Sequence, residues 1–243
     1  MGSAYGWATA TGPRPDNQDR CAVGPTWAVV SDGAGGHRGG ALAARLTVDA
    51  VAPRLATVHV GPTEAALVLE AVDAAAAAVR DRQVAEPAVA DMAATVTLAV
   101  VAEPGRRLWW VGNVGDSPAW LVSADSAVRI TQDHNAAAEL VRAGVLSVDE
   151  ARTSPGRHVI TRCIGGGGLG VPEVDVAAVA IPPGGRLVLA SDGLSVLDGA
   201  AMMDVVADTP ELFTIARRLV AEALAAGATD NVTVVVVAGD GAR

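Results

Sequence analysis

The fold is decided by the stretch Trp27-Ala-Val-Val-Ser-Asp32-Gly-Ala-Gly-Gly-His37-Arg-Gly-Gly40. A short apolar run of strand length stops at Asp32, and five of the next eight residues are glycine. Glycine allows the backbone to turn sharply or to approach a ligand closely. Apolar residues then recur at helical spacing over 41–56, which predicts an amphipathic helix. The pattern therefore predicts a carboxylate held at the end of a strand, beside a tight loop.

Four further aspartates stand in the same kind of position. Asp192 ends an apolar run, Asp230 precedes one, Asp116 follows a third, and Asp19 closes the segment Arg-Pro-Asp-Asn-Gln-Asp. A strand end holds such a side chain rigidly while its carboxylate reaches the loop region. One Asp-Gly or Asp-Asn pair alone is usually a turn. Carboxylates gathered from the whole chain, however, would repel one another strongly unless cations neutralised them.

The residue types predict which cations these would be. Hard divalent ions such as Mg²⁺ and Mn²⁺ prefer oxygen ligands. The chain has two cysteines, Cys21 and Cys163, and neither they nor the histidines show the spacing of a zinc site or a disulfide framework. Glycines beside the aspartates leave room for backbone carbonyls and water. We therefore predict a binuclear Mg²⁺ or Mn²⁺ site.

Strand-like and helix-like segments are grouped along the chain and do not strictly alternate. Runs rich in β-branched residues over 95–101 and 107–116 predict strands, and 62–83 and 210–226 predict helices. The last helix carries one apolar stripe, formed by Leu212, Ile215, Ala216, Leu219, Val220 and Ala223. This grouping predicts an α+β layered architecture in a single domain spanning 1–243.

Composition argues against several classes of function. The 18 basic and 27 acidic residues give a net charge of −9, whereas nucleic-acid and membrane-surface binders need a basic footprint. No apolar run is long enough to cross a bilayer, and the first residues do not resemble a signal peptide. We expect a cytoplasmic protein that binds neither nucleic acid nor membranes.

Eight segments of the chain together resemble one known family. They are Arg14-Pro-Asp-Asn-Gln-Asp19, Asp32-Gly-Ala-Gly-Gly-His37, Ala94-Thr-Val-Thr97, Val114-Gly-Asp116-Ser-Pro118, Ile130-Thr-Gln-Asp-His134-Asn135, Val159-Ile-Thr-Arg162-Cys-Ile-Gly165, Ser191-Asp192-Gly-Leu194 and Thr229-Asp230-Asn231-Val-Thr233. In this order they are similar to the motifs of the metal-dependent Ser/Thr protein phosphatases of the protein phosphatase 2C type, in their compact bacterial form. The resemblance covers nearly the whole chain.

The resemblance implies roles for the metal-binding residues. Asp32 would bridge the two metal ions, and the Gly33 carbonyl would bind one of them. Asp192 and Asp230 would ligate the other ion. Asp19 would hold metal-bound water or ligate directly.

Further implications concern the substrate and the fold. Arg14 would grip the substrate phosphate, because a guanidinium matches two phosphate oxygens. Asp116, together with Asp192, would anchor a third, weaker metal. The family fold implies a four-layer α-β-β-α sandwich, in which helix pairs flank a central antiparallel β-sandwich. Residues 135–157 would form a mobile flap beside the site.

The implied reaction is the hydrolysis of phosphoserine and phosphothreonine in proteins by a water that bridges two Mn²⁺ or Mg²⁺ ions and is activated by them. The partners would be phosphorylated proteins, including bacterial Ser/Thr kinases and their substrates, and the chain would act as a monomer. A phosphatase of anti-sigma-factor antagonists would share the chemistry and differ in partner. A non-catalytic phosphoprotein-binding module on the same fold is the alternative, and loss of a metal carboxylate would be its signature.

The chain departs from the family pattern at several positions. Gln18 stands where many members have glutamate, and Pro118 replaces an arginine. Ala34 occupies the place of a histidine that some members use as a general acid. His37 is the nearest candidate for that role, although a hydrogen bond beside the metal ligands is the favoured reading. His158 is predicted to be an ordinary surface residue.

Overall fold

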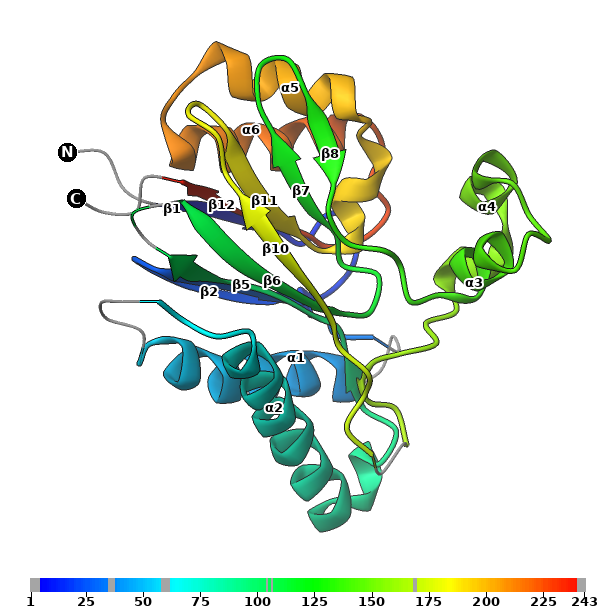
Figure 1. Cartoon of the computed structure of the whole chain (residues 1–243). Helices are drawn as coiled ribbons and strands as arrows, with labels where there is room; N and C mark the ends of the chain where they lie inside the picture. The colour runs from blue at the N-terminus through cyan, green and yellow to red at the C-terminus, as the bar shows by residue number, and fades with distance from the viewer. Residues whose placement is uncertain are drawn as a thin grey trace.

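Two five-stranded antiparallel sheets stack face to face in the computed structural model, which describes residues 5–34, 38–57, 62–103, 105, 107–167 and 170–239 (Figure 1). One sheet has the order β1 (Tyr5–Ala10), β12 (Val232–Ala238), β11 (Arg186–Ala190), β7 (Ala119–Val122) and β8 (Ala127–Arg129). The other has the order β10 (Asp175–Ala180), β6 (Leu108–Val114), β5 (Val96–Glu103), β3 (Trp27–Ser31) and β2 (Arg20–Gly24). A small third sheet pairs β4 (Ala93–Ala94) with β9 (Ile164–Gly165).

Alternation along the central strands explains why both faces of each sheet are covered. Val235 and Val237 of β12 pack between the sheets, whereas Val234 and Val236 pack on the opposite face, under helices. Successive side chains of a strand point to opposite faces. A nearly continuous apolar run is therefore the pattern of a strand buried on both sides.

A pair of helices covers each outer face of the sandwich (Figure 1). The pair α1 (Arg38–Leu55) and α2 (Ala66–Ala85) packs on the β3–β5 sheet, and α5 (Gly199–Asp208) and α6 (Leu212–Ala225) pack on the β12–β11 sheet. The predicted stripe of α6 is buried at all of its positions. The four-layer α-β-β-α architecture is therefore confirmed.

Two helices differ from the sequence pattern for local reasons. The helix predicted to begin at Pro62 begins at Ala66, because Thr63 is tied to the sheet: its N–H donates to the Ala102 carbonyl at 2.8 Å, and its carbonyl accepts from Trp110 Nε1 at 2.7 Å. Helix α5 was not predicted, since Asp198-Gly reads as a turn. In the structure the Asp198 carboxylate caps that helix by accepting from the Ala201 N–H at 2.9 Å.

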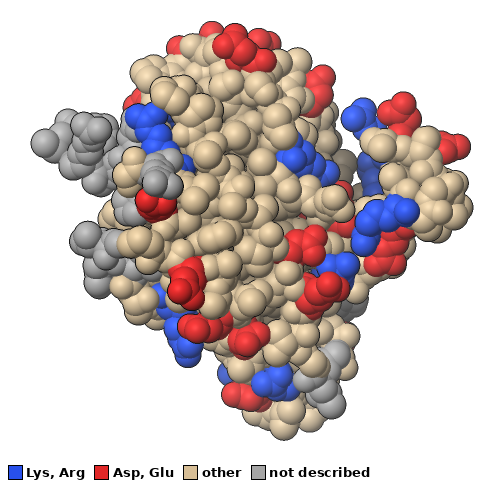
Figure 2. Space-filling model, in the orientation of Figure 1, with Lys and Arg blue, Asp and Glu red and all other residues tan. Residues whose placement is uncertain are grey.

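A helical segment projects away from the sandwich between β8 and β9 (Figure 1). It contains α3 (Ala136–Arg142), α4 (Val148–Thr153) and the 3₁₀ turn η3 (Pro155–His158). Ser147 and Glu150 form a capping box at the start of α4. Figure 2 shows acidic and arginine side chains interspersed on this segment and on the adjoining face. None of the described helices is long and apolar enough to cross a bilayer.

Candidate metal centre

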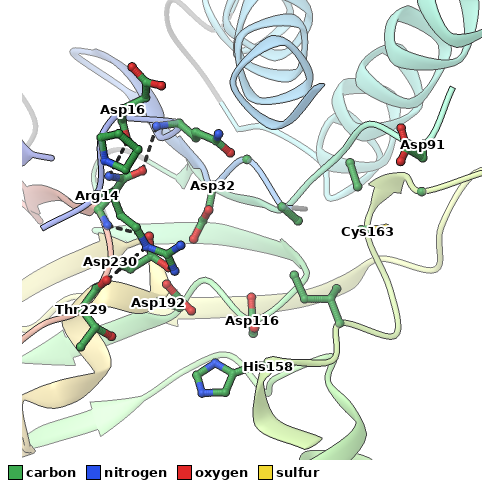
Figure 3. Close-up of a pocket in the computed structure, with 18 residues that line it drawn as sticks. Arg14, Asp16, Asp32, Asp91, Asp116, His158, Cys163, Asp192, Thr229 and Asp230 are labelled. Carbon is green, nitrogen blue, oxygen red and sulfur yellow. Dashed lines mark hydrogen bonds and ion pairs between the residues drawn. The ribbon is translucent and has the colours of Figure 1, made fainter. Parts of the chain in front are cut away.

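The strand-end aspartates meet at a pocket of about 1090 Å³ at one end of the sandwich (Figure 3). Asp32 follows β3, Asp116 lies two residues after β6, and Asp192 lies two residues after β11, while Asp230 precedes β12. Antiparallel pairing brings the end of β11 beside the start of β12, with Ala190 opposite Val234. The topology therefore places side chains from distant parts of the sequence around one space.

Crowding and burial make the ionised form of these carboxylates costly. Burial raises the pKa of Asp32 well above its ordinary value, and the charges of Asp19 and Asp192 raise it further. Burial also raises the pKa of Asp116 to about 7, with the nearby Asp192 adding to the effect, and raises the pKa of Asp192, next to Asp230. Such a cluster needs protons or cations to balance its charge near neutral pH.

Asp19 joins the cluster from the start of β2. Burial raises the pKa of its carboxyl to about 6, although hydrogen bonds from Ser191 and Thr233 lower it. Its Oδ1 atom and the Oδ1 atom of Asp192 are buried, and neither has a hydrogen-bond partner among the described residues. A buried carboxylate oxygen without a partner is costly. These two oxygens are therefore suited to receive a cation or its water ligands.

The donor set fits Mg²⁺ or Mn²⁺ with a shell completed by other oxygens. In the described part of the chain, no three His, Cys, Asp or Glu side chains converge closely enough to hold an ion by themselves. Backbone carbonyls and water would complete the coordination, as is usual for Mg²⁺. Gly33 lines the pocket, and a Cβ atom there would come within 2.4 Å of the Gly40 backbone. The lack of a side chain therefore lets the Gly33 backbone pack directly against the first turn of α1.

Arg14 lies at the rim of the pocket and is paired with Asp230 (Figure 3). Its Nη2 donates to Asp230 Oδ2 at 2.7 Å, and its Nε donates to the Thr229 carbonyl at 3.2 Å. Asp230 Oδ1 accepts from the Asn231 N–H at 2.8 Å. Asp230 therefore differs from Asp19 and Asp192, because both of its oxygens have partners within the protein.

A comparison of the chain with models of known protein families shows to which family it belongs. The family model described as Protein phosphatase 2C matches residues 15–232. The chain belongs to the protein phosphatase 2C family. The predicted family and fold are therefore confirmed.

Individual relatives agree with this phosphatase 2C assignment. The chain is 32% identical over 223 residues to "Serine/threonine protein phosphatase PstP" of Mycobacterium tuberculosis, covering 92% of this chain and 42% of that protein. The chain thus spans less than half of that relative. A crystal structure of the phosphatase MsPP from Mycobacterium smegmatis in complex with cacodylate is 36% identical, with a TM-score of 0.83 and coverage of 96% of this chain and 97% of that one.

A further solved structure is that of the catalytic domain of PstP in complex with two manganese ions. It is 29% identical to this phosphatase 2C chain, with a TM-score of 0.82, and the match covers 96% of each chain.

Hydroxyl groups that support the carboxylates were not singled out from the sequence. Ser191 Oγ donates to Asp19 Oδ2 at 2.7 Å and accepts from the Thr233 N–H at 2.9 Å. Thr95 Oγ1 accepts from the Asp32 N–H at 2.9 Å. Each of these residues stands within one of the phosphatase 2C motifs. Their position inside these motifs was the only sequence signal that could have pointed to them as supporting residues.

Two histidines complete the comparison with the predicted site residues. His37 lies outside the described residues of this phosphatase 2C chain. His158 is exposed, as predicted, but it also lines the pocket, where Figure 3 shows it below Asp116. Its charge lowers the pKa of Asp192, against the larger effects of burial and Asp230. The pocket contact was missed because the turn η3, which carries His158, reaches the site only in the folded chain.

Proposed function

We propose that this chain hydrolyses phosphoserine and phosphothreonine in proteins at a centre that holds two Mn²⁺ or Mg²⁺ ions. The observation that carries the proposal is the convergence of Asp32, Asp116, Asp192 and Asp230 on one pocket whose rim bears an arginine, with Asp19 buried close enough to feel two of their charges. Its relatives support the proposal, because they are named Ser/Thr protein phosphatases and one solved relative contains two manganese ions. All five carboxylates predicted from the sequence are present, which disfavours a binding module without activity.

The metal ions would be held by Asp32, Asp192 and the Gly33 carbonyl, with Asp230 as a further ligand. When bound, divalent ions lower the pKa of water and balance negative charge on phosphoryl oxygens. Asp19 Oδ1, which has no hydrogen-bond partner in the part of the chain that the structure describes, would accept a hydrogen bond from a water bound beside the cluster, while Ser191 Oγ donates to the opposite oxygen of that carboxylate at 2.7 Å. Asp19 would thus position a water on the side of the cluster nearest to β2.

Arg14 would bind the phosphoryl group. Its side chain is half exposed at the pocket rim, and its guanidinium is already aligned by Asp230 and the Thr229 carbonyl. A planar guanidinium can present two N–H groups to two phosphate oxygens. Asp230 therefore would serve both the metal centre and the orientation of the arginine that binds the substrate.

Finer features belong to the same proposal. Asp116 and Asp192 would hold a third ion, and the projecting segment 135–157 would act as a flap over the substrate. We further propose a single catalytic domain that acts as a cytoplasmic monomer in signalling and opposes bacterial Ser/Thr kinases.

The proposal is tested by measuring phosphate release from a phosphothreonine peptide with Mn²⁺, with EDTA, and after Asp32→Ala. Release that needs Mn²⁺ and is lost in the variant is expected. Release that survives both chelation and Asp32→Ala would reject the metal mechanism. Binding of the peptide by the Mn²⁺-loaded wild type without release would instead indicate the binding module.

A further inference from the structure

Both the N–H and the carbonyl of Gly115, the residue before Asp116, form hydrogen bonds within the protein. Its N–H donates to His134 Nδ1 at 3.1 Å. Its carbonyl accepts from the His134 N–H and from Asn113 Nδ2, each at 3.1 Å. Gly115 has a φ of +111°, and a Cβ atom there would lie 2.6 Å from the Thr95 side chain. The turn that aims Asp116 into the pocket is therefore tightly specified, and His134 supplies two of its contacts.

The opposite nitrogen of the same ring faces a carboxylate. Since Nδ1 accepts from the Gly115 N–H, the ring proton of neutral His134 lies on Nε2. Nε2 is 3.1 Å from Asp175 Oδ2, and Arg162 Nη1 donates to Asp175 Oδ1 at 3.1 Å. His134 itself is only 1% exposed. The imidazole is thus fixed in one orientation between a backbone amide and a carboxylate.

His134 also lies where the projecting segment leaves and rejoins the sandwich. The His134 carbonyl accepts from the Thr161 N–H at 2.8 Å, and the Ala136 N–H donates to the Val159 carbonyl at 2.9 Å. Asn135 pairs with Ile160 in an isolated antiparallel bridge. These contacts form a short two-stranded stem at the base of the segment, and Arg162 immediately follows it.

We propose that His134 is a positioning residue that joins this stem to the metal centre. Through Nδ1 it holds Gly115 and thereby the direction of the Asp116 carboxylate. Through Nε2 it contacts Asp175, which also accepts a hydrogen bond from Arg162 at the end of the stem. These contacts hold the stem in place. The inference rests on the proposed function, because it takes Asp116 as a metal carboxylate. His134 touches neither substrate nor metal ion in this role.

Two substitutions test the contacts of Nδ1 and of Nε2 separately. In His134→Asn the amide oxygen falls near the place of Nδ1, so the variant keeps an acceptor for the Gly115 N–H and loses the Asp175 contact. In His134→Gln the amide nitrogen falls near the place of Nε2, so the variant keeps the Asp175 contact and loses the acceptor. Asp175→Asn tests the stem side alone, at a half-exposed position where misfolding is less of a concern.

Calorimetric titration of the full chain with Mn²⁺ gives a readout that does not depend on turnover. Loss of a group that supports a metal ligand typically weakens metal affinity by roughly 10- to 100-fold, and we expect a loss in that range at the weakest site in His134→Gln. His134→Asn and Asp175→Asn should stay near the wild-type affinity. Hydrogen exchange over 135–161 should rise in His134→Asn and Asp175→Asn and remain low in His134→Gln.

The outcomes distinguish this inference from the function on which it rests. If the wild-type chain binds no Mn²⁺, both the proposed function and the proposed link between His134 and the metal centre are overturned. If the wild type binds Mn²⁺ and His134→Gln binds it equally well, only the role of His134 is overturned. Equal loss of affinity in the Asn and Gln variants, with equal loss of thermal stability, would show that His134 is merely structural and would also overturn it.

Discussion

Arg14 and Asp230 are separated by 216 positions in the chain, yet Arg14 Nη2 donates to Asp230 Oδ2 at 2.7 Å. The two side chains are 49% and 37% exposed, and an ion pair with that exposure contributes little to stability. The pair instead joins the arginine that we propose binds phosphate to a carboxylate of the proposed metal centre. A change at either residue should therefore alter function more than it alters folding.

Arg14→Ala should lower kcat/KM for a phosphothreonine peptide. Loss of a hydrogen bond to a charged group costs about 1.5–3 kcal/mol, which corresponds to roughly 10- to 100-fold in kcat/KM. Arg14→Lys should recover part of this, because it keeps the charge and loses the planar fork. The thermal midpoint of both variants should stay near that of the wild type. Unchanged kcat/KM in Arg14→Ala would contradict the assigned role.

Asp32→Asn should abolish activity while stabilising the metal-free chain. The amide removes a carboxyl whose ionised form is disfavoured by burial and by the charges of Asp19 and Asp192, so repulsion within the cluster decreases. We expect a higher thermal midpoint than wild type in EDTA, and a smaller gain from added Mn²⁺. Asp73→Asn, at an exposed position of α2, is the matched control and should change neither quantity. A lower midpoint of Asp32→Asn in EDTA would speak against crowding of the carboxylates.

The metal-free chain should become less stable as the pH rises from about 4 to about 7. Burial raises the folded pKa of Asp19 to about 6 and that of Asp116 to about 7, from an ordinary value of 3.8. Between the ordinary and the raised values the folded chain binds more protons than the unfolded chain, so the free energy of unfolding falls with pH. This contribution is complete below the ordinary value and is lost above the raised ones.

Urea unfolding in EDTA at a series of pH values measures that slope. Asp116→Asn should flatten the slope in the upper part of the range. Excess Mn²⁺ should oppose this loss of stability at higher pH. Metal ligands must be deprotonated, so Mn²⁺ binding strengthens as the pH rises. A stability that is flat or that increases with pH in EDTA would contradict the raised pKa values.

Ser191→Ala should reduce both stability and activity. The variant leaves Asp19 Oδ2 without its donor and the Thr233 N–H without its acceptor, both in buried surroundings. Leaving such groups unsatisfied costs about 1–3 kcal/mol, which urea unfolding would detect. The neighbouring Ser195 is exposed, so Ser195→Ala provides the control. Equal stability of the two variants would show that the Ser191 hydroxyl does not support Asp19.

Much of the architecture was predictable because its signals are local. The nearly continuous apolar run of β12 and the helical stripe of α6 each record burial in a few neighbouring residues, and the structure confirms that both are buried. Elements without such a signal were missed. Helix α5 begins at Asp198-Gly, which reads equally well as a turn, and its identity depends on packing against α6 and the sheet.

The sequence by itself determined which aspartates stand beside apolar runs, and the structure places Asp32, Asp116, Asp192 and Asp230 at strand ends, as those runs predicted. Only the tertiary structure decided which of these groups touch. The raised pKa values, the Arg14–Asp230 pair, the Ser191 support of Asp19 and the placement of His134 between Gly115 and Asp175 all depend on residues far apart in the chain. Burial and pairing of that kind arise when the two sheets stack, and no local pattern encodes them.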